Sequence, residues 1–236
     1  SSDVCSSDLL PKPKGRIDVD NLLYIPPNSK KPILQGISFT LMPGESLGII
    51  GPSAAGKSTL ARLLVGIWPP NNGFVRLDGA NIYEWDRNVI GEYVGFLPQG
   101  AMLFKGNIKE NIARMGTIDD EKVVAAAKFV DAHDMILKID KGYEADTNMY
   151  HLSGGQNQRI ALARAFYGFP KFVLLDEPES NLDEEGMAAL EIIFKRAQAA
   201  GITLIVVSQR PSLMQLLSKV MILRDGKVDQ YGRTSP

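Results

Sequence analysis

The chain has 236 residues, 44% of them hydrophobic, and its 26 Lys and Arg residues nearly balance 27 Asp and Glu residues. This balance argues against a nucleic-acid binder that works by general basicity, because neutralising phosphates needs a surplus of cationic side chains. The apolar runs are far shorter than the roughly 20 residues that cross a bilayer, and a single cysteine excludes an intrachain disulfide, so we expect a reduced, soluble, cytosolic domain without a membrane span.

The first ten residues read SSDVCSSDLL, a Ser/Asp-rich stretch without the periodicity of a helix or a strand. This composition is typical of an unstructured leader. The string DVCSSDL also resembles the translation of a sequencing adapter, so a natural linker and a read artefact both stay open. We expect residues 1–14 to be a flexible or artefactual leader, residues 15–236 to be the folded domain, and a transmembrane domain to be absent from this chain.

The amino-terminal half has the apolar patterns of several strands and one helix. The helix is expected over residues 57–65, because Leu60, Leu63 and Leu64 fall on one face. The turn Asp78-Gly79 is typical of a hairpin. The predicted strands cover residues 16–24, 37–41, 47–50, 74–77 and 93–97.

The middle of the chain is different in character, because its apolar residues follow helical spacing. Helices are predicted over residues 108–114, 121–130 and 135–137, with Thr117 and Asp119 as caps, and they form a helical subdomain over about residues 100–165. Strands and helices then alternate again. The predicted strands cover residues 172–175 and 203–207, the helices 184–200 and 212–217, and a hairpin turns at Asp225-Gly226. This alternation implies an α/β fold with a mainly parallel sheet and ligands at the carboxyl ends of its strands.

Residues 51–58 read GPSAAGKS and match the phosphate-loop pattern G-x-x-x-x-G-K-[ST]. The match lies between a predicted strand and a predicted helix, where the backbone N–H groups and the helix N-terminus point at a phosphate chain. Lys57 would reach the β and γ phosphates, and the Ser58 hydroxyl would bind Mg²⁺. A Gly turn that merely precedes a helix is the alternative.

Residues 172–177 read FVLLDE, an apolar strand that ends in two carboxylates. Asp176 is well placed to hold the water shell of a metal ion beside the phosphate loop, and Glu177 to orient or deprotonate an attacking water. Acidic residues also end strands as the solvated start of a loop, so the functional interpretation of this stretch depends on its pairing with the phosphate loop.

Residues 152–156 read LSGGQ and precede a helix expected to run to about residue 167. Ser153 is a natural N-cap, and Gly154 and Gly155 leave backbone N–H groups uncovered for a second anion.

The three motifs together, in this order and spacing, resemble the nucleotide-binding domain of ABC ATPases over about residues 15–234. The resemblance implies a P-loop NTPase fold of ABC type, with a mainly parallel core sheet, an antiparallel β-subdomain and a helical subdomain. It implies ATP and Mg²⁺ as ligands. It also implies a head-to-tail dimer with a second copy of the same domain, in which each ATP lies between residues 51–59 of one copy and residues 153–156 of the other.

The same resemblance assigns roles to individual residues. Gln99 falls at the Q-loop, which links Mg²⁺ and the attacking water to the transporter, and residues 180–183 (SNLD) fall at the D-loop. Glu177, Gln209 and Gln99 are the expected catalytic residues, and Ser58, Gln99 and Asp176 the expected metal ligands. The residues expected to bind nucleotide are Tyr24, Gly51, Pro52, Ser53, Ala54, Ala55, Gly56, Lys57, Ser58, Thr59, Ser153, Gly154, Gly155, Gln156 and Asp183.

The chain departs from the family pattern at three places. Gln209 stands where the family usually has a histidine that contacts the γ-phosphate; its amide donates a hydrogen bond but carries no positive charge. The hypothesis is that ATP binds while hydrolysis is slowed or lost; a family member that tolerates glutamine and an engineered substitution are the alternatives. Pro26 aligns with the adenine-stacking tyrosine, which leaves Tyr24 as the aromatic candidate. Residues 146–151 (DTNMYH) replace a Gly/Glu-rich loop.

Within the family, stretches such as LARLLVGIWPP and RIALARAFYG are most similar to type I protein secretion exporters for proteases and lipases, the PrtD group. This similarity implies an ATPase motor at the cytoplasmic side of the bacterial inner membrane. Its expected partners are the exporter's transmembrane domain and, through it, membrane fusion and outer-membrane proteins, with no nucleic acid. A non-transport ABC ATPase of DNA repair or translation and a non-hydrolysing ATP-binding module are the alternatives. The segment between Ser58 and Ser153 lacks the long heptads of the DNA-repair class.

Overall fold

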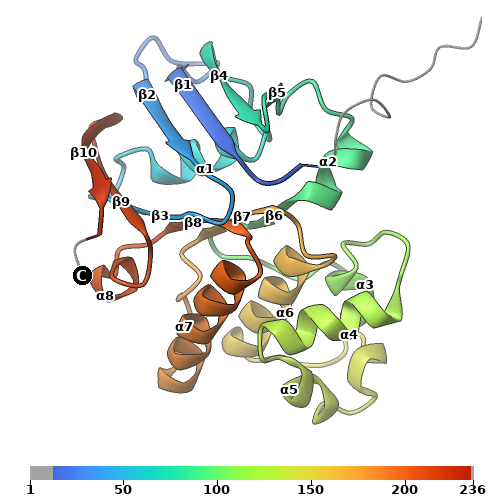
Figure 1. The fold of residues 1–236 in the computed structure, drawn as a ribbon. Helices are drawn as coiled ribbons and strands as arrows, with labels where there is room; N and C mark the ends of the chain where they lie inside the picture. The colour runs from blue at the N-terminus through green and yellow to red at the C-terminus, as the bar shows by residue number, and fades with distance from the viewer. Residues whose placement is uncertain (1–12, 235–236) are drawn as a thin grey trace, which may run out of the picture.

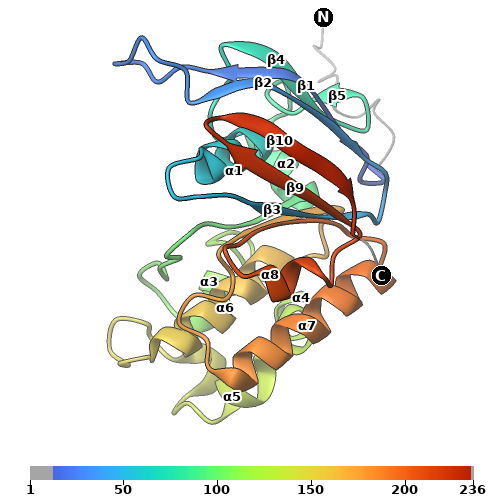
Figure 2. The ribbon, with the colours of Figure 1, turned by 90° about the vertical axis from the view of Figure 1, so that its left-hand side faces the viewer.

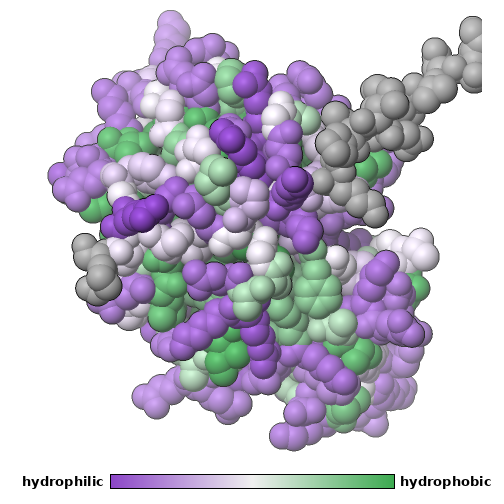
Figure 3. All heavy atoms as spheres, in the orientation of Figure 1, coloured by the Kyte–Doolittle hydropathy of each residue, from purple (hydrophilic) through white to green (hydrophobic). Residues whose placement is uncertain are grey.

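The computed structural model describes residues 13–234, so residues 1–12 of the predicted leader lie outside the described residues. Two sheets and a helical layer are stacked, as Figure 1 shows: a four-stranded sheet at the top, a six-stranded sheet across the middle and most helices below. Hydrophilic side chains cover much of the surface in this view, while hydrophobic side chains gather over the helical layer (Figure 3). Within residues 13–234, no helix is both long and apolar enough to cross a membrane.

The central sheet is mainly parallel, as the sequence predicts. Its order is β10-β9-β3-β8-β7-β6; all neighbours run parallel except the β10–β9 pair. Every residue of β7 and β8 is buried, which explains their continuous apolar sequence, because both faces of such a strand are covered. The strands are β3 (Ser46–Ile50), β6 (Val94–Leu97), β7 (Phe172–Asp176), β8 (Thr203–Val207), β9 (Lys219–Arg224) and β10 (Lys227–Arg233).

The second sheet is antiparallel, with the order β2-β1-β4-β5. Its strands are β1 (Ile17–Tyr24), β2 (Leu34–Leu41), β4 (Asn72–Leu77) and β5 (Ala80–Asn81). Helix α1 (Lys57–Leu64) lies between the two sheets (Figure 2), and its Leu60 and Leu63 join one core with Leu174 of β7. The phosphate-loop pattern therefore begins a helix that is held from both sides.

The helical layer covers the opposite face of the central sheet. Val173 and Leu175 of β7 point into its core, whereas their neighbours Phe172 and Leu174 point toward α1, as the two-residue period of a strand requires. The helices are α3 (Ile108–Ile112), α4 (Asp120–Phe129), α5 (His133–Leu137), α6 (Gly154–Phe166), α7 (Glu184–Ala199) and α8 (Pro211–Met214), with a 3₁₀ turn at Gly142–Glu144. The boundaries given for the helical subdomain stay a prediction.

One of the local predictions was confirmed and several were wrong. Asp119 caps α4 by accepting from the Lys122 N–H, but Thr117 caps no helix. The capping box of α3 is instead formed by Asn107 and Glu110. Helix α2 (Arg87–Tyr93) has no counterpart in the sequence analysis because it buries a single residue and so has no apolar periodicity. The helix expected over residues 212–217 is only the short α8.

Arg114 ties the helical layer to the central sheet. Its guanidinium donates to the main-chain carbonyls of Arg164 (3.0 Å), Ala165 (3.1 Å) and Tyr167 (3.3 Å), where α6 ends. The same side chain donates to the carbonyls of Gly91 and Val94, where α2 passes into β6. One cation therefore supplies donors to carbonyl groups at the ends of two helices, although the Arg164 carbonyl also accepts from the Tyr167 N–H at 3.4 Å.

Replacing this cation should loosen the joint between the two layers. We expect Arg114→Met to lower the free energy of unfolding by about 2 kcal/mol, because it leaves partly buried carbonyl groups without donors. Urea denaturation measures this change. Arg224→Met is the matched control, since the Arg224 side chain is 64% exposed and its ion pair with Asp229 is 4.0 Å long; it should cost less than about 1 kcal/mol. Equal losses in the two variants would contradict the role given to Arg114.

Candidate functional site

The loop between β3 and α1 has a backbone that only small residues allow. Gly56 has φ 99° and Ala54 has φ 63°, both in the left-handed region. A Cβ on Gly51 would lie 2.1 Å from the carbonyl oxygen of Leu223. Among the described side chains none caps the N-terminus of α1, so its first N–H groups stay available for an anion.

Lys57 lies across the mouth of this loop. Its ammonium donates to the carbonyl oxygens of Gly51 at 2.8 Å and Pro52 at 2.9 Å, and the residue is 7% exposed. Both partners are neutral, so the positive charge is not compensated by an ion pair at these contacts. The loop thus combines free N–H donors with a fixed cation, which is the chemistry that binds a phosphate chain.

Asp176 ends β7 beneath the loop and is 2% exposed. Its Oδ1 is buried and finds no hydrogen-bond partner among residues 13–234. Burial raises the pKa of this carboxyl above its ordinary value, and a hydrogen bond from the Ser58 hydroxyl partly opposes the shift. An unpaired buried carboxylate oxygen next to a hydroxyl fits a hard cation such as Mg²⁺.

The remaining ligands of such an ion would come from elsewhere. In the described part of the chain, no group of three or more His, Cys, Asp or Glu side chains could hold a metal. Mg²⁺ ordinarily uses one or two protein carboxylates and completes its shell with phosphate oxygens and water. Asp176 and Ser58 therefore fit an ion that arrives with a nucleotide.

Glu177 follows directly and is held from two sides. Its carboxylate accepts from Gln99 Nε2 at 2.7 Å and from Gln209 Nε2 at 3.2 Å. Gln99 follows β6, Glu177 follows β7 and Gln209 follows β8, so three neighbouring parallel strands deliver these side chains at their carboxyl ends. Glu177 itself has φ 51°, and its N–H donates to the Val207 carbonyl at 2.8 Å. The three residues that the sequence analysis named as catalytic lie together.

The phosphate loop, Gln99, Glu177 and Gln209 line one pocket of about 620 Å³. The residues lining it that the sequence analysis had named are Ser53, Ala54, Gly56, Lys57, Ser58, Thr59, Gln99, Glu177 and Gln209. Four further residues that it did not name as site residues also line the pocket: Pro32, Ile33, Asp225 and Gly226. The N–H of Gly226 donates to the Ala55 carbonyl at 3.2 Å. The only signal for this contact was the hairpin turn at Asp225-Gly226, which says nothing about a distant loop.

Tyr24 lies outside this pocket. It is 9% exposed, belongs to the core of the antiparallel sheet, and its ring stacks on Trp68 with centroids 5.6 Å apart and an interplanar angle of 9°. The indole occupies one face of the tyrosine ring, and the residue as a whole is largely buried. The role of Tyr24 as the adenine-stacking residue stays a prediction; in this structure Tyr24 does not line the phosphate-loop pocket.

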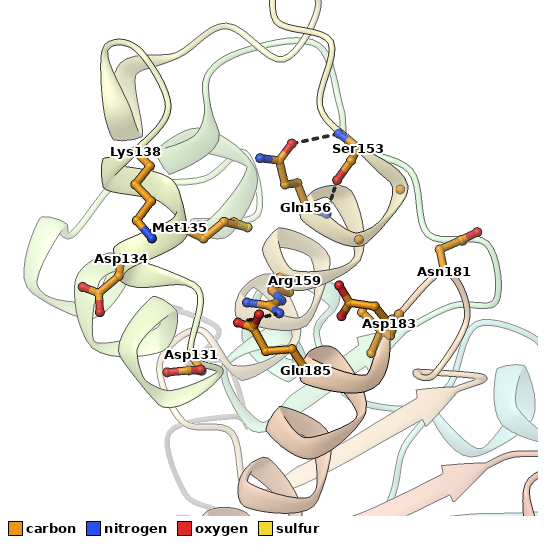
Figure 4. A pocket seen from close by; sticks show the side chains of 13 residues that line it. Asp131, Asp134, Met135, Lys138, Ser153, Gln156, Arg159, Asn181, Asp183 and Glu185 are labelled. Carbon is orange, nitrogen blue, oxygen red and sulfur yellow. Dashed lines mark hydrogen bonds and ion pairs between the residues drawn. The ribbon is translucent and has the colours of Figure 1, made fainter.

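The LSGGQ stretch begins α6, and the predicted N-cap is confirmed. Ser153 Oγ accepts from the Gln156 N–H at 3.2 Å, while Gln156 Oε1 accepts from the Ser153 N–H at 2.8 Å (Figure 4). A Cβ on Gly154 would lie 3.2 Å from the Asn181 Cβ, so the glycine lets the 180–183 turn approach the helix. Asp183 caps α7 by accepting from the Gly186 N–H at 2.9 Å.

A second pocket of about 760 Å³ opens beside this helix start (Figure 4). Ser153, Gly154, Gly155, Gln156 and Asp183 line it, together with side chains of α5 and α7. In the described chain the two pockets have no lining residue in common. The structure therefore gathers most of the predicted nucleotide-binding residues into two separate groups, while Tyr24, Gly51, Pro52 and Ala55 line neither pocket.

Comparisons with known proteins agree with one another about the family of this chain. The family model described as "ABC transporter" matches residues 34–180. The chain is 43% identical over 226 residues to the type I secretion system ATP-binding protein PrsD of Rhizobium meliloti (strain 1021), covering 94% of this chain and 39% of that protein. It is 35% identical to human ATP-binding cassette sub-family B member 6, covering 93% of this chain and 26% of that protein.

A solved structure described as a bacterial Atm1-family ABC exporter with ATP bound superposes with a TM-score of 0.83. The two chains are 30% identical, and the match covers 95% of this chain and 41% of the exporter. This chain thus spans less than half the length of each of these proteins. The likeness confirms the predicted fold class.

The unpaired carboxylate of Asp176 should make stability depend on pH. Because burial raises its folded-state pKa above the unfolded value, the folded chain holds a proton that the unfolded chain releases, and stability falls as the pH rises through the raised pKa. Without magnesium, we expect Asp176→Asn to gain about 1 kcal/mol in unfolding free energy at pH 8. The gain should vanish near pH 4, about the ordinary carboxyl pKa. Urea denaturation in EDTA at both pH values measures it.

Asp229→Asn serves as the control, because its side chain is 41% exposed, and we expect it to have little effect at either pH. A gain for Asp176→Asn that is equal at both pH values, or a loss at pH 8, would contradict the cause given for the shift.

Proposed function

Because this chain belongs to the ABC transporter family, which implies ATP hydrolysis, we propose that it is the ATP-binding and hydrolysing motor domain of a type I protein exporter. The observation that carries this proposal is the pocket in which the phosphate loop, Gln99, Glu177 and Gln209 meet. A phosphate cradle alone would serve many reactions, whereas a carboxylate held beside it by two amides is suited to activate water.

In the proposed reaction, water attacks the γ-phosphorus of ATP, the bond to the ADP oxygen breaks, and ADP and phosphate leave. The loop N–H groups and Lys57 hold the phosphates, and Glu177 accepts the proton of the attacking water. Asp176 and Ser58 would hold Mg²⁺, which neutralises charge on the phosphate oxygens. The amides of Gln99 and Gln209 orient the Glu177 carboxylate by donating to one oxygen each.

The two separate pockets support a dimer as the active form. One pocket offers the phosphate loop, and the other offers the N-terminus of α6 with two glycines. A helix N-terminus of this length favours a negative charge. A head-to-tail pair of copies would bring the second pocket of one copy over the phosphates held by the other, so each dimer would enclose two ATP molecules.

The export function rests on the relatives. The similarity to the protein named type I secretion system ATP-binding protein PrsD supports a transmembrane domain as partner and the cytoplasmic side of the bacterial inner membrane as location. Met102, Phe104 and Met149 are 81%, 54% and 76% exposed. The segments that carry Phe104 and Met149 meet, because Thr147 Oγ1 donates to the Phe104 carbonyl at 2.8 Å. Exposed apolar side chains of this kind suit contact with membrane-domain helices. Membrane fusion and outer-membrane proteins would associate through that membrane domain.

A hydrolysis-impaired ATP-binding domain is the second candidate, and Gln209 is the observation that favours it. Its amide reaches Glu177 at 3.2 Å but remains neutral at every pH, so it adds no positive charge where the transition state gathers negative charge. On this reading the chain closes around ATP and reopens slowly. A non-transport ABC ATPase finds less support, since none of the relatives compared above is described as one.

Steady-state hydrolysis tests the motor directly. We expect the chain to release phosphate from ATP in the presence of Mg²⁺. Glu177→Gln should lower kcat about a hundredfold or more while ATP still binds, because the proton acceptor is lost. Lys57→Ala should abolish ATP binding. Glu191→Gln and Lys195→Ala, on the exposed face of α7, are the matched controls and should leave both quantities unchanged.

Light scattering on the same samples tests the dimer. Glu177→Gln with ATP should run at twice the mass of the chain without nucleotide. ATP bound only by monomers would contradict the proposed arrangement of the two pockets.

Gln209→His separates the two candidate functions. A hydrolysis-impaired parent predicts that the histidine variant gains about tenfold or more in kcat, with an added pH dependence near the ordinary imidazole pKa of about 6.5. ATP affinity should stay within about threefold, because the phosphate loop is untouched. Equal kcat values in the parent and the variant would show that glutamine suffices and would reject the impaired reading. Gln209→Ala, which removes one of the two donors to Glu177, should have a kcat below both.

A further inference from the structure

A buried acid lies two residues beyond Glu177 and is not used by the proposed reaction. Glu179 is only 8% exposed, and its Oε2 is buried without a hydrogen-bond partner in the described chain. Its Oε1 accepts from the hydroxyl of Ser208, which is fully buried. A carboxylate in such a position costs stability unless its contacts compensate, so its presence calls for an explanation.

The hydrogen-bond directions around Ser208 are fixed. The Arg210 N–H donates to Ser208 Oγ at 3.0 Å, which occupies a lone pair of the hydroxyl and leaves its proton for Glu179. The Ser208 N–H donates to the Ile49 carbonyl at 3.2 Å. Ser208 therefore connects the end of β3, just before the phosphate loop, with the turn that follows β7.

Gln209 lies between Ser208 and Arg210, and hydrogen bonds hold both of these neighbours. Ser208 before it is tied to Glu179, and Arg210 after it is tied to Ser208. The Gln209 amide meets Glu177 at 3.2 Å, near the long end of the range for a hydrogen bond. A small movement of the loop would break this contact, so the backbone on both sides of Gln209 must stay in place.

The turn that carries Glu177 is bound to the same point. The Ser180 N–H donates to the Glu177 carbonyl at 3.1 Å and the Leu182 N–H to the Glu179 carbonyl at 3.3 Å. The Glu179 side chain thus joins a tight turn after β7 to the loop after β8, and each segment carries one partner of the Glu177–Gln209 contact. Neither Glu179 nor Ser208 lines the pocket itself.

We propose that Glu179 is a positioning residue for hydrolysis: by accepting the Ser208 hydrogen bond, it holds Gln209 against Glu177. The inference rests on the proposed ATP hydrolysis but concerns residues outside the reacting set. The carboxylate acts through geometry, so what matters is an acceptor oxygen at Oε1 rather than the charge. Glu179→Gln keeps that acceptor, whereas Glu179→Ala and Ser208→Ala each remove one side of the same bond.

Hydrolysis kinetics give the first test. Glu179→Ala and Ser208→Ala should each lower kcat about tenfold and leave the Kd for Mg-ATP within about threefold. The double variant should also lose about tenfold rather than a hundredfold, because both changes break one contact. Glu179→Gln should stay within about twofold of the parent. Additive losses, a loss in ATP affinity instead of kcat, or a Glu179→Gln variant as slow as Glu179→Ala would each overturn the proposal.

Ser46→Ala is the control for a merely structural effect. It also removes a buried hydroxyl, one that bonds Ser218 at 3.3 Å at the far end of β3. It should lower the melting temperature as much as Ser208→Ala does while leaving kcat unchanged. An equal loss of kcat in the two variants would show that general stability is responsible and would overturn the positioning role.

Hydrogen exchange followed by mass spectrometry tests the contact even if the chain hydrolyses no ATP. Glu179→Ala should raise the exchange rate of the segment 206–214 about tenfold, because the Ser208 hydroxyl that accepts from the Arg210 amide is no longer held by Glu179 and the loop opens more often. Glu179→Gln and Ser46→Ala should leave that segment protected. Unchanged exchange in Glu179→Ala would overturn the proposal. Faster exchange in a chain without hydrolysis would keep the contact and reject only the proposed function.

Discussion

The burial of the central strands on both faces is the constraint on which the rest of the structure depends. Every residue of β7 and β8 is covered, on one side by α1 and the antiparallel sheet and on the other by the helical layer. Such strands can present polar groups only where they end. Because they run parallel, they end at the same edge, and Asp176, Glu177 and Gln209 follow as neighbours from that geometry.

This constraint also explains how much the sequence could predict. Motifs whose chemistry is local were read correctly: the phosphate loop lies between a strand and a helix, Ser153 caps α6, and Asp119 caps α4. Each depends on residues a few positions apart, and so a pattern suffices. The parallel sheet followed from the alternation of strands and helices, and its edge brought Gln99, Glu177 and Gln209 together.

What the sequence could not predict depends on contacts between distant segments. Tyr24 stacks on Trp68, 44 positions further along the chain, and no local pattern predicts that contact. Pro32 and Asp225 line the pocket because two hairpin turns meet beside the phosphate loop. Glu179 and Ser208 read as an ordinary acid and an ordinary hydroxyl until the fold buries them against each other.

The capping box at the start of α6 determines which hydrogen-bonding groups of the LSGGQ stretch remain free. The amide oxygen of Gln156 is engaged by the Ser153 N–H, and the Ser153 oxygen by the Gln156 N–H. One lone pair of each acceptor oxygen is therefore occupied within the chain, while the Gln156 NH₂ group, the Ser153 hydroxyl proton and the glycine N–H groups remain as donors. The start of α6 therefore offers mainly donors, although the carboxylates of Asp131, Asp134, Asp183 and Glu185 line the same pocket. A ligand rich in oxygen lone pairs can accept from these donors while the helix cap stays closed.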